Sequence, residues 1–415
     1  MASFERRKEN NPLGKNNITN VVKKLNTNNV DAISNNNSPT PVNCRIICVS
    51  RKPKIGKKIF FGEYDHYIRV DYVSHEIARR LKEHAEANTW FTKELNFTQD
   101  IQGIEKLDEK ALRIFKYNIA YQNLMDSGVS NSFTNVLAPL CSQPIWQLLY
   151  MRIGYEESIH AESYSYALHL IFNEKAEEIL DLVYYDPFVQ KRLEHEVDTF
   201  EEVYKYVLLG RNKDRKAKEL ILEALLRTYF LEGVKFPFSF FTAWTINEVY
   251  DNAIQGVSRM LKLIAHDELT THVPTGYSLM NILRDEEEQG FQELFKSSWF
   301  DEKALEIAKQ VMEEEIAWSN YLLKDGELLN YTKEINEHFI RYQTQDKLRK
   351  IRVDFKLLGL NEKKSDIIEW FDNYRDLNRS NTALQEADNL TYQKSTLTND
   401  LNKFDEFKKL EEELF

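Results

Sequence analysis

Helical periodicity dominates the sequence from about Val73 to about residue 350, and this feature restricts the chain to a helical fold. Over this stretch apolar residues return every three to four positions, which places them on one face of a helix. The 415 residues include only 13 Gly and 9 Pro. Folds that need frequent tight turns or a glycine-rich phosphate loop are therefore disfavoured. The sequence predicts an all-α protein.

The helical pattern divides into segments, which together form a predicted helical domain over 73–376. The expected helices are 73–87, 107–136, 144–173, 187–209, 213–245, 246–270, 276–290, 301–323, 330–345 and 365–376. Residues 1–43 include 12 Asn and have little apolar surface to bury, so we expect a disordered leader. Residues 44–72 are β-branched and aromatic, which predicts an extended arm or short strands. The polar segment 377–415 is expected to be a flexible tail.

Charge and composition narrow the function. The net charge is −11, with 66 acids against 55 bases, which argues against nucleic-acid binding. The sequence contains no run of 18 apolar residues, and its N-terminus lacks the apolar stretch of a signal peptide. The three cysteines (Cys44, Cys48 and Cys141) are too few for a disulfide framework. We expect a cytoplasmic protein that binds neither nucleic acid nor a membrane.

Four successive helical segments each carry a carboxylate in apolar surroundings, and two of them add a histidine. These residues are Asp126, Glu157 with His160, Glu232, and Glu268 with His272. Residues three or four positions apart share one face of a helix, so each glutamate and its histidine point to one place. Carboxylates and imidazoles that converge inside a helix bundle are typical of a dinuclear iron or manganese site.

A solvated helix face also explains any one pair of an acid and a histidine, because 66 acids and nine His produce such pairs by chance. The order of the segments is the stronger signal: a lone acid, an acid with histidine, a lone acid, and again an acid with histidine. Unpaired charges on apolar faces are costly to bury, and bound metal ions remove that cost. Spacing alone leaves both a metal site and a helical scaffold with solvated acids open.

The residues around these positions resemble the radical-generating small subunit of class I ribonucleotide reductase, from about residue 85 to the C-terminus. The motifs are Tyr121-Gln-x-Leu-x-Asp126-Ser, Glu157-Ser-Ile-His160-Ala-Glu-Ser-Tyr164, Leu231-Glu232 with Phe236 and Phe240, and Ile264-Ala-His-Asp267-Glu268. Trp90 lies 36 residues before Asp126, as the family's radical-transfer tryptophan does. The segment from Ala383 to Tyr392 is similar to the family's tail around a mobile redox tyrosine.

The resemblance implies a ferritin-like helical bundle with additional helices, and a dinuclear site for two iron ions, with manganese possible. Its ligands would be Asp126, Glu157, His160, Glu232, Glu268 and His272. Tyr164 would carry a stable tyrosyl radical, generated with dioxygen and shielded by Phe236, Phe240 and Ile264. The radical would pass through His160, Asp267, Trp90 and Tyr392 to a large subunit, which reduces ribonucleotides to deoxyribonucleotides.

The family also suggests partners and competing functions. The resemblance implies a homodimer, and a large catalytic subunit bound through the C-terminal tail, with Leu414 and Phe415 as apolar anchors. A diiron oxygenase or oxidase of the same superfamily would share all six ligands. Trp90, Tyr164, Asp267 and the tail favour the reductase. An iron-storage protein of the ferritin type would be shorter and would not need that tail.

Two positions depart from the family's pattern. The second histidine of the family follows its glutamate by three residues, which here is Thr271, whereas His272 follows Glu268 by four. A four-residue spacing still leaves both side chains on one helix face, and a π-bulge is a second way to absorb the extra residue. The other departure is Pro237, shortly after Glu232. Proline inside a helix removes a backbone hydrogen bond, so we expect a kink or a bulge there.

Overall fold

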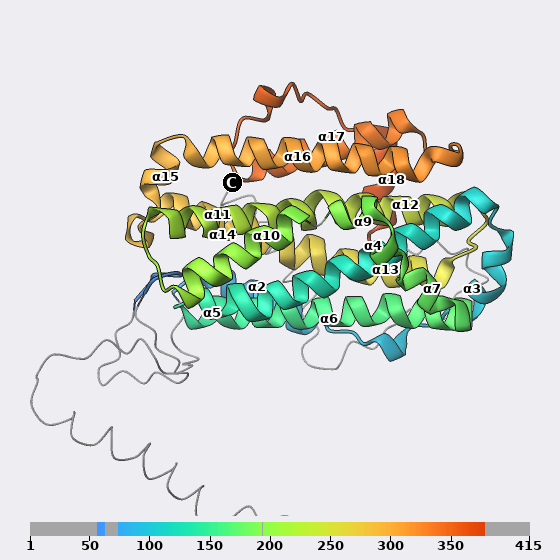
Figure 1. Cartoon of the computed structure of the whole chain (residues 1–415), viewed down its shortest axis with the longest axis horizontal. Coiled ribbons are helices and arrows are strands. Elements are labelled where there is room, and N and C mark those ends of the chain that lie inside the picture. The colour runs from blue at the N-terminus through green and yellow to red at the C-terminus, as the bar shows by residue number, and fades with distance from the viewer. Residues whose placement is uncertain (1–55, 63–73, 193, 378–415) are drawn as a thin grey trace, which may run out of the picture. The chain divides into compact units, whose positions relative to one another are not determined.

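The long apolar segments fold into helices that bury their apolar faces against one another (Figure 1). The computed structural model describes residues 56–62, 74–192 and 194–377. Within these ranges the chain forms helices and no strand, and its only β-type pairings are isolated bridges of Phe60 with Cys141 and of Leu328 with Tyr331. The all-α prediction is confirmed for this part of the chain.

The helices follow one another with short connections. The longer α-helices are α2 (Glu76–Ala87), α4 (Glu109–Ser132), α6 (Pro144–Phe172), α10 (Glu194–Glu202), α11 (Arg215–Phe230), α12 (Phe236–Val249), α13 (Gln255–Asp267), α14 (Val273–Asp285), α16 (Trp299–Leu322), α17 (Lys333–Lys350) and α18 (Asp366–Tyr374). The shorter ones are α3 (Thr98–Gly103), α5 (Ala138–Leu140), α7 (Ala176–Leu180), α8 (Leu182–Tyr185), α9 (Pro187–Lys191) and α15 (Gln292–Lys296). The π-helical segments are η3 (Phe133–Leu137), η5 (Val203–Leu209), η6 (Leu231–Lys235) and η7 (Glu268–His272). The 3₁₀ turns are η1 (Thr92–Glu94), η2 (Ile104–Lys106), η4 (Asn173–Lys175), η8 (Glu287–Gln289), η9 (Leu323–Asp325) and η10 (Phe355–Leu358).

Four long helical runs form the central bundle. α4 packs along α6, η6 joins α11 to α12, and η7 joins α13 to α14. α12 packs against both α4 and α13, and residues 236–247 of α12 are all buried, as expected for a helix that is apolar on every side. α16 and α17 pack on each other on one side of the bundle, with α6 on the opposite side (Figure 1). The space between the four runs is therefore closed to solvent.

Proline explains where three of the four π-segments occur. Pro139, Pro237 and Pro274 each follow the last residue of a π-segment by two positions, after η3, η6 and η7 respectively. A proline ring clashes with the carbonyl four residues earlier, and that residue lies in the middle of the π-segment in each case. A π-turn carries one residue more than an α-turn and moves this carbonyl away. The distortion predicted at Pro237 is confirmed, and it takes the form of a π-bulge.

Several predicted helix boundaries were wrong. The break expected between 270 and 276 is absent, because α13, η7 and α14 follow one another without interruption from Gln255 to Asp285. The expected break at 245/246 lies instead between Val249 and Gln255, where Asp251 and Asn252 adopt positive φ and turn the chain. The side chain of Asn247 stabilises this turn, because its Oδ1 accepts a hydrogen bond from the backbone N–H of Ile254 at 3.0 Å. The single helix expected over 187–209 is instead divided into α9, α10 and η5.

Several predictions fall outside the described residues. The leader 1–43 lies wholly outside them, as do Tyr392, Leu414 and Phe415. Of the arm 44–72, only 56–62 is described, and there Phe60 contacts the bundle through its bridge to Cys141. The described part of the chain contains no helix with the length and apolar character needed to cross a membrane.

Candidate dinuclear metal site

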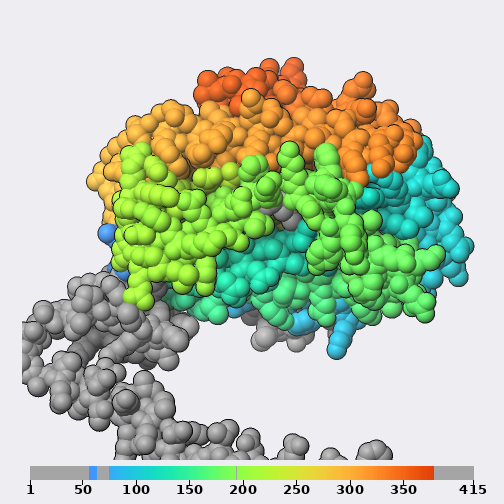
Figure 2. Space-filling model, in the orientation of Figure 1, coloured from blue at the N-terminus to red at the C-terminus, as the bar shows by residue number. Residues whose placement is uncertain are grey.

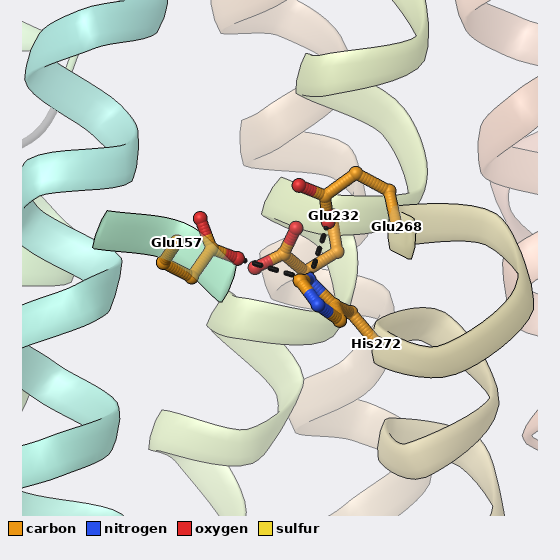
Figure 3. A group of neighbouring side chains, drawn as sticks. All are labelled: Glu157, Glu232, Glu268 and His272. Atoms are coloured by element: carbon orange, nitrogen blue, oxygen red, sulfur yellow. Dashed lines mark hydrogen bonds and ion pairs between the residues drawn. The ribbon is translucent and has the colours of Figure 1, made fainter. Parts of the chain in front are cut away.

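The four central runs bring the six predicted ligands together. Asp126 comes from α4, Glu157 and His160 from α6, Glu232 from η6, and Glu268 and His272 from η7. All six are buried, with at most 4% of any of them exposed. Their ligand atoms form two groups, each within 4.8 Å: Glu157, Glu232, Glu268 and His272 in one, and Asp126, Glu157 and His160 in the other. Figure 3 shows the first group pointing to a common centre.

Both histidines present Nδ1 to the carboxylates. His272 Nδ1 lies 2.9 Å from Glu157 Oε1 and 2.8 Å from Glu268 Oε2. His160 Nδ1 lies 3.3 Å from Glu268 Oε1 and 3.6 Å from Glu157 Oε2. Glu157 and Glu268 therefore each approach both imidazoles, whose ring centres are 5.8 Å apart. Two carboxylates therefore lie between two imidazoles, and these four side chains would contribute to holding a pair of ions.

The π-segment η7 explains the unusual spacing of His272. Glu268 and His272 are its first and last residues. Because a π-turn contains one more residue than an α-turn, a four-residue spacing in it directs the two side chains much as a three-residue spacing does in an α-helix. Of the two ways to accommodate the extra residue, the structure shows the π-bulge, and His272 rather than Thr271 reaches the cluster.

Within the described residues, many ligand atoms of the cluster have no hydrogen-bond partner. Atoms without a hydrogen bond include Asp126 Oδ1 and Oδ2, Glu157 Oε1 and Oε2, His160 Nδ1, Glu232 Oε1 and Oε2, and Glu268 Oε1. Buried polar atoms of this kind are costly unless something binds them. Two divalent cations would balance the four carboxylates, and oxygen and imidazole donors suit iron and manganese. The residues present therefore fit a dinuclear centre of either metal.

The pKa values of four of the ligands are raised, because the carboxylates of the cluster are buried close to one another. Burial, and then the charge of Glu157, raises the pKa of Asp126 well above its usual value. Burial, and then the charge of Glu268, does the same for the pKa of Glu232. Burial lowers the pKa of each histidine, but the carboxylates around His160 and His272 outweigh it and raise both pKa values. Without cations, the cluster must hold protons.

A hydrogen-bonded connection leads out of the cluster from His160. His160 Nε2 lies 3.2 Å from Asp267 Oδ2, and the indole Nε1 of Trp90 donates to the same oxygen at 2.7 Å. The Trp90 ring also stacks on the His160 ring, with centres 5.8 Å apart and planes 13° from parallel. Burial raises the pKa of Asp267 to about 6. The structure thus joins three residues that the sequence assigned to one transfer route.

Comparison with known proteins decides the family. Residues 71–355 match the model of the family described as ribonucleotide reductase, small chain. The chain belongs to the ribonucleotide reductase small-chain family. A curated relative of this small chain is the ribonucleoside-diphosphate reductase 1 subunit beta of Salmonella typhimurium, which is 24% identical over 362 residues, 83% of this chain and 93% of the relative.

Solved structures share the fold of this small chain. The ribonucleotide reductase R2 subunit of Clostridium botulinum matches with a TM-score of 0.70 and 22% identity, over 80% of this chain and 98% of that one. A mutant R2-like ligand-binding oxidase with a reconstituted Mn/Fe cofactor matches with a TM-score of 0.53 and 15% identity, over 68% and 95% of the two chains. The predicted ferritin-like bundle is confirmed.

Tyr164 of the small chain is fully buried on α6, one turn beyond His160. Burial, and then the charge of Asp126, raises the pKa of the Tyr164 phenol. Phe236, Phe240 and Ile264, the predicted shield, are also fully buried. A phenol in these surroundings is kept away from water and next to the predicted ligands.

The sequence analysis missed two residues of the site. Glu156 Oε2 lies 3.2 Å from His272 Nε2, and Arg152 Nη2 lies 3.0 Å from Glu156 Oε1. Both residues line a narrow crevice with Trp90, His160 and Asp267. The available signal was a second glutamate directly before Glu157 on an apolar helix, with an arginine four residues earlier.

Proposed function

We propose that this chain is the radical-generating small subunit of an aerobic ribonucleoside-diphosphate reductase. The observation that carries the proposal is the connection from His160 through Asp267 to Trp90. Iron storage or oxidation of a bound substrate needs the six ligands but not a tryptophan hydrogen-bonded to the partner of a ligand. Transfer of an electron hole out of the bundle needs that tryptophan. The match to the ribonucleotide reductase small-chain family also favours the reductase over the oxidase.

We assign the six cluster residues as ligands of two metal ions, iron by preference and manganese as the alternative. When bound, a reduced centre of this kind reacts with dioxygen and supplies the oxidising power to remove one electron from a tyrosine. The chain's own residues determine where that electron comes from. Tyr164 is fully buried beside the cluster, so it is the phenol placed to give it up.

Tyr164 must lose its phenolic proton together with the electron, because a neutral tyrosyl radical carries no proton. Asp126 is the carboxylate whose charge acts most strongly on this phenol. This strong interaction supports a role for Asp126 as the group that accepts the phenolic proton. The surrounding apolar side chains exclude water and reductants, which would quench the radical.

We further propose that the hole leaves through Asp267 and Trp90 and continues through Tyr392 on the tail to the large subunit. The tail 377–415, with Leu414 and Phe415 as anchors, would bind a groove on that subunit. A homodimer, and a location in the cytoplasm, complete the proposal. We propose these steps because this sequence resembles the family at the matching positions.

Reconstitution tests the proposed function. Metal-free protein is loaded with ferrous iron without oxygen, air is admitted, and the electron paramagnetic resonance spectrum is recorded, with Tyr164→Phe as the matched control. A tyrosyl signal in the wild type that is missing from the variant is the expected result. Metal oxidation without a radical in iron-loaded and manganese-loaded protein would favour the oxidase, and a chain that takes up no metal would overturn the assignment.

A further inference from the structure

The two histidines of the cluster hold reciprocal partners. His160 lies on α6 and its outer nitrogen meets Asp267 at the end of α13, directly before Glu268. His272 lies on η7, in the same helical run as α13, and its outer nitrogen meets Glu156 on α6, directly before Glu157. In each helical run, two adjacent acidic residues precede a histidine. The first acid of one run contacts the histidine of the other run. The sequence analysis assigned a role only to Asp267.

Glu156 lies outside the cluster. Its Oε2 approaches His272 Nε2 at 3.2 Å, whereas Nδ1 on the other side of the ring faces Glu157 and Glu268. Glu156 is 2% exposed, so water does not compete for this contact. An imidazole that donates Nε2–H to a carboxylate keeps its Nδ1 lone pair free for a metal ion.

Arg152 holds Glu156 from the opposite side. Its Nη2 lies 3.0 Å from Glu156 Oε1 and also donates to the backbone oxygen of Ala85 at 3.0 Å and to Thr89 Oγ1 at 2.8 Å. The two oxygens of Glu156 are thus divided between a fixed cation and His272. A carboxylate neutralised and anchored in this way has little freedom to turn away from the ring.

From this geometry we infer that Glu156, held by Arg152, is the positioning residue for His272 and fixes the metal position formed by Glu157, Glu232, Glu268 and His272. The inference rests on the proposed function, because it assumes that the cluster binds metal. This role also explains why the partners of the two histidines differ. Asp267 leads to an oxidisable indole, whereas Glu156 leads to a guanidinium, which cannot carry an electron hole. Glu156 should therefore control metal loading rather than radical transfer.

Titration with Mn²⁺ tests the inference, because free Mn²⁺ is visible by electron paramagnetic resonance and no turnover is required. The main variant is the double substitution Glu156→Leu with Arg152→Met, which removes both charges and leaves neither buried alone. Wild-type chain is expected to bind two ions. The double variant should keep one site and bind the other about 10–100-fold more weakly, as loss of a ligand's hydrogen-bond partner usually does. Glu156→Gln, whose amide oxygen still accepts from Nε2–H, should bind more tightly than the double variant.

The control is Glu162→Gln, on the exposed face of α6, which should match the wild type. A folded double variant, checked by circular dichroism, that binds both ions as tightly as the wild type would overturn the role of Glu156. Glu156→Gln binding no more tightly than the double variant would also count against it, because the amide oxygen of Gln should still hold the His272 imidazole. If the wild type itself bound no ion pair, the proposed function would fail instead.

Discussion

The indole nitrogen of Trp90 lies 2.7 Å from Asp267 Oδ2, the same oxygen that His160 Nε2 approaches at 3.2 Å. One carboxylate oxygen thus serves a predicted metal ligand and an aromatic ring that is 3% exposed. The link is short, buried and specific to one of the two histidines. Under the proposed function, this link is the exit for the electron hole.

Trp90→Phe should separate radical formation from radical use. Phenylalanine keeps an aromatic ring near His160, but it has no N–H for Asp267 and is much harder to oxidise. Metal content and the Tyr164 radical should stay near wild-type values after reconstitution with added reductant, whereas nucleotide reduction with the large subunit should fall to background. Assays of radical content and turnover on one preparation check this. Turnover that persists in the variant would place the exit elsewhere.

Pro274→Ala should raise the free energy of unfolding and weaken metal binding. The proline ring forces the widened turn of η7, and alanine would allow an ordinary α-turn there, at a gain of up to about 3 kcal/mol in the free energy of unfolding. The α-turn would rotate His272 away from Glu268, so the chain should bind one ion less tightly. Denaturant unfolding and Mn²⁺ titration measure the two effects. Pro139→Ala is the matched control, because η3 carries no predicted ligand and its loss should leave metal binding intact.

Much of the site was predictable from local sequence, because the spacing of residues along a helix determines which side chains share a face. Spacing and order pointed to the six candidate ligands, and the family resemblance added the roles of Tyr164 and Asp267. The structure brings the six ligands together and places Asp267 against His160. The π-bulge at Pro237 was also foreseeable, since proline has a fixed local effect. The same reasoning applied to Pro139 and Pro274 would have placed η3 and η7 as well.

The remainder depended on contacts between distant segments. Glu156 has the same local setting as a solvated acid, and only the approach of η7 gives it His272 as a partner, 116 positions away. The break after Val249 was missed because Asn247 stabilises the turn through a side-chain bond that periodicity does not reveal. His338, four residues after Glu334, contacts Glu362 and Ser365 instead of forming a ligand pair. Spacing alone could not separate that pair from the ligand pairs.

Metal binding should release protons, and affinity should rise with pH. Burial, and then neighbouring carboxylates, raises the pKa values of Asp126 and Glu232, and the carboxylates also raise those of His160 and His272. These groups therefore hold protons that ions must displace. Calorimetry in buffers of different ionisation enthalpy counts the protons released. An unchanged binding enthalpy across those buffers would contradict the prediction.

The same pKa directions fix how stability depends on pH. All four groups have pKa values raised above those of the unfolded chain, so at these positions the metal-free folded state binds more protons than the unfolded state, while Glu268, whose pKa is lowered, opposes this effect in part. Stability of the metal-free protein should therefore fall as pH rises above about 4, where unfolded carboxyls ionise, and fall further above about 6.5, where unfolded histidines lose their protons. Metal-loaded protein should show a flatter profile. Denaturant unfolding from below the first of these pH values to above the second, with and without Mn²⁺, provides the comparison.

Lys235 should prove essential to the segment that carries Glu232. It lies in η6, fully buried, and its Nζ donates to the Arg192 backbone oxygen at 3.0 Å, to Glu196 Oε1 at 2.8 Å and to Glu314 Oε2 at 3.0 Å. Burial lowers the pKa of Lys235, but the charges of Glu196 and the other acidic groups around it together outweigh burial, raise the pKa and keep the ammonium ionised. Lys235→Met would leave two glutamates without their cation, at a cost of about 3–5 kcal/mol in the free energy of unfolding. Lys216→Met, which removes an exposed partner of Glu202, should change stability little by comparison. Equal effects of the two substitutions in denaturant unfolding would show that the buried network does not stabilise η6.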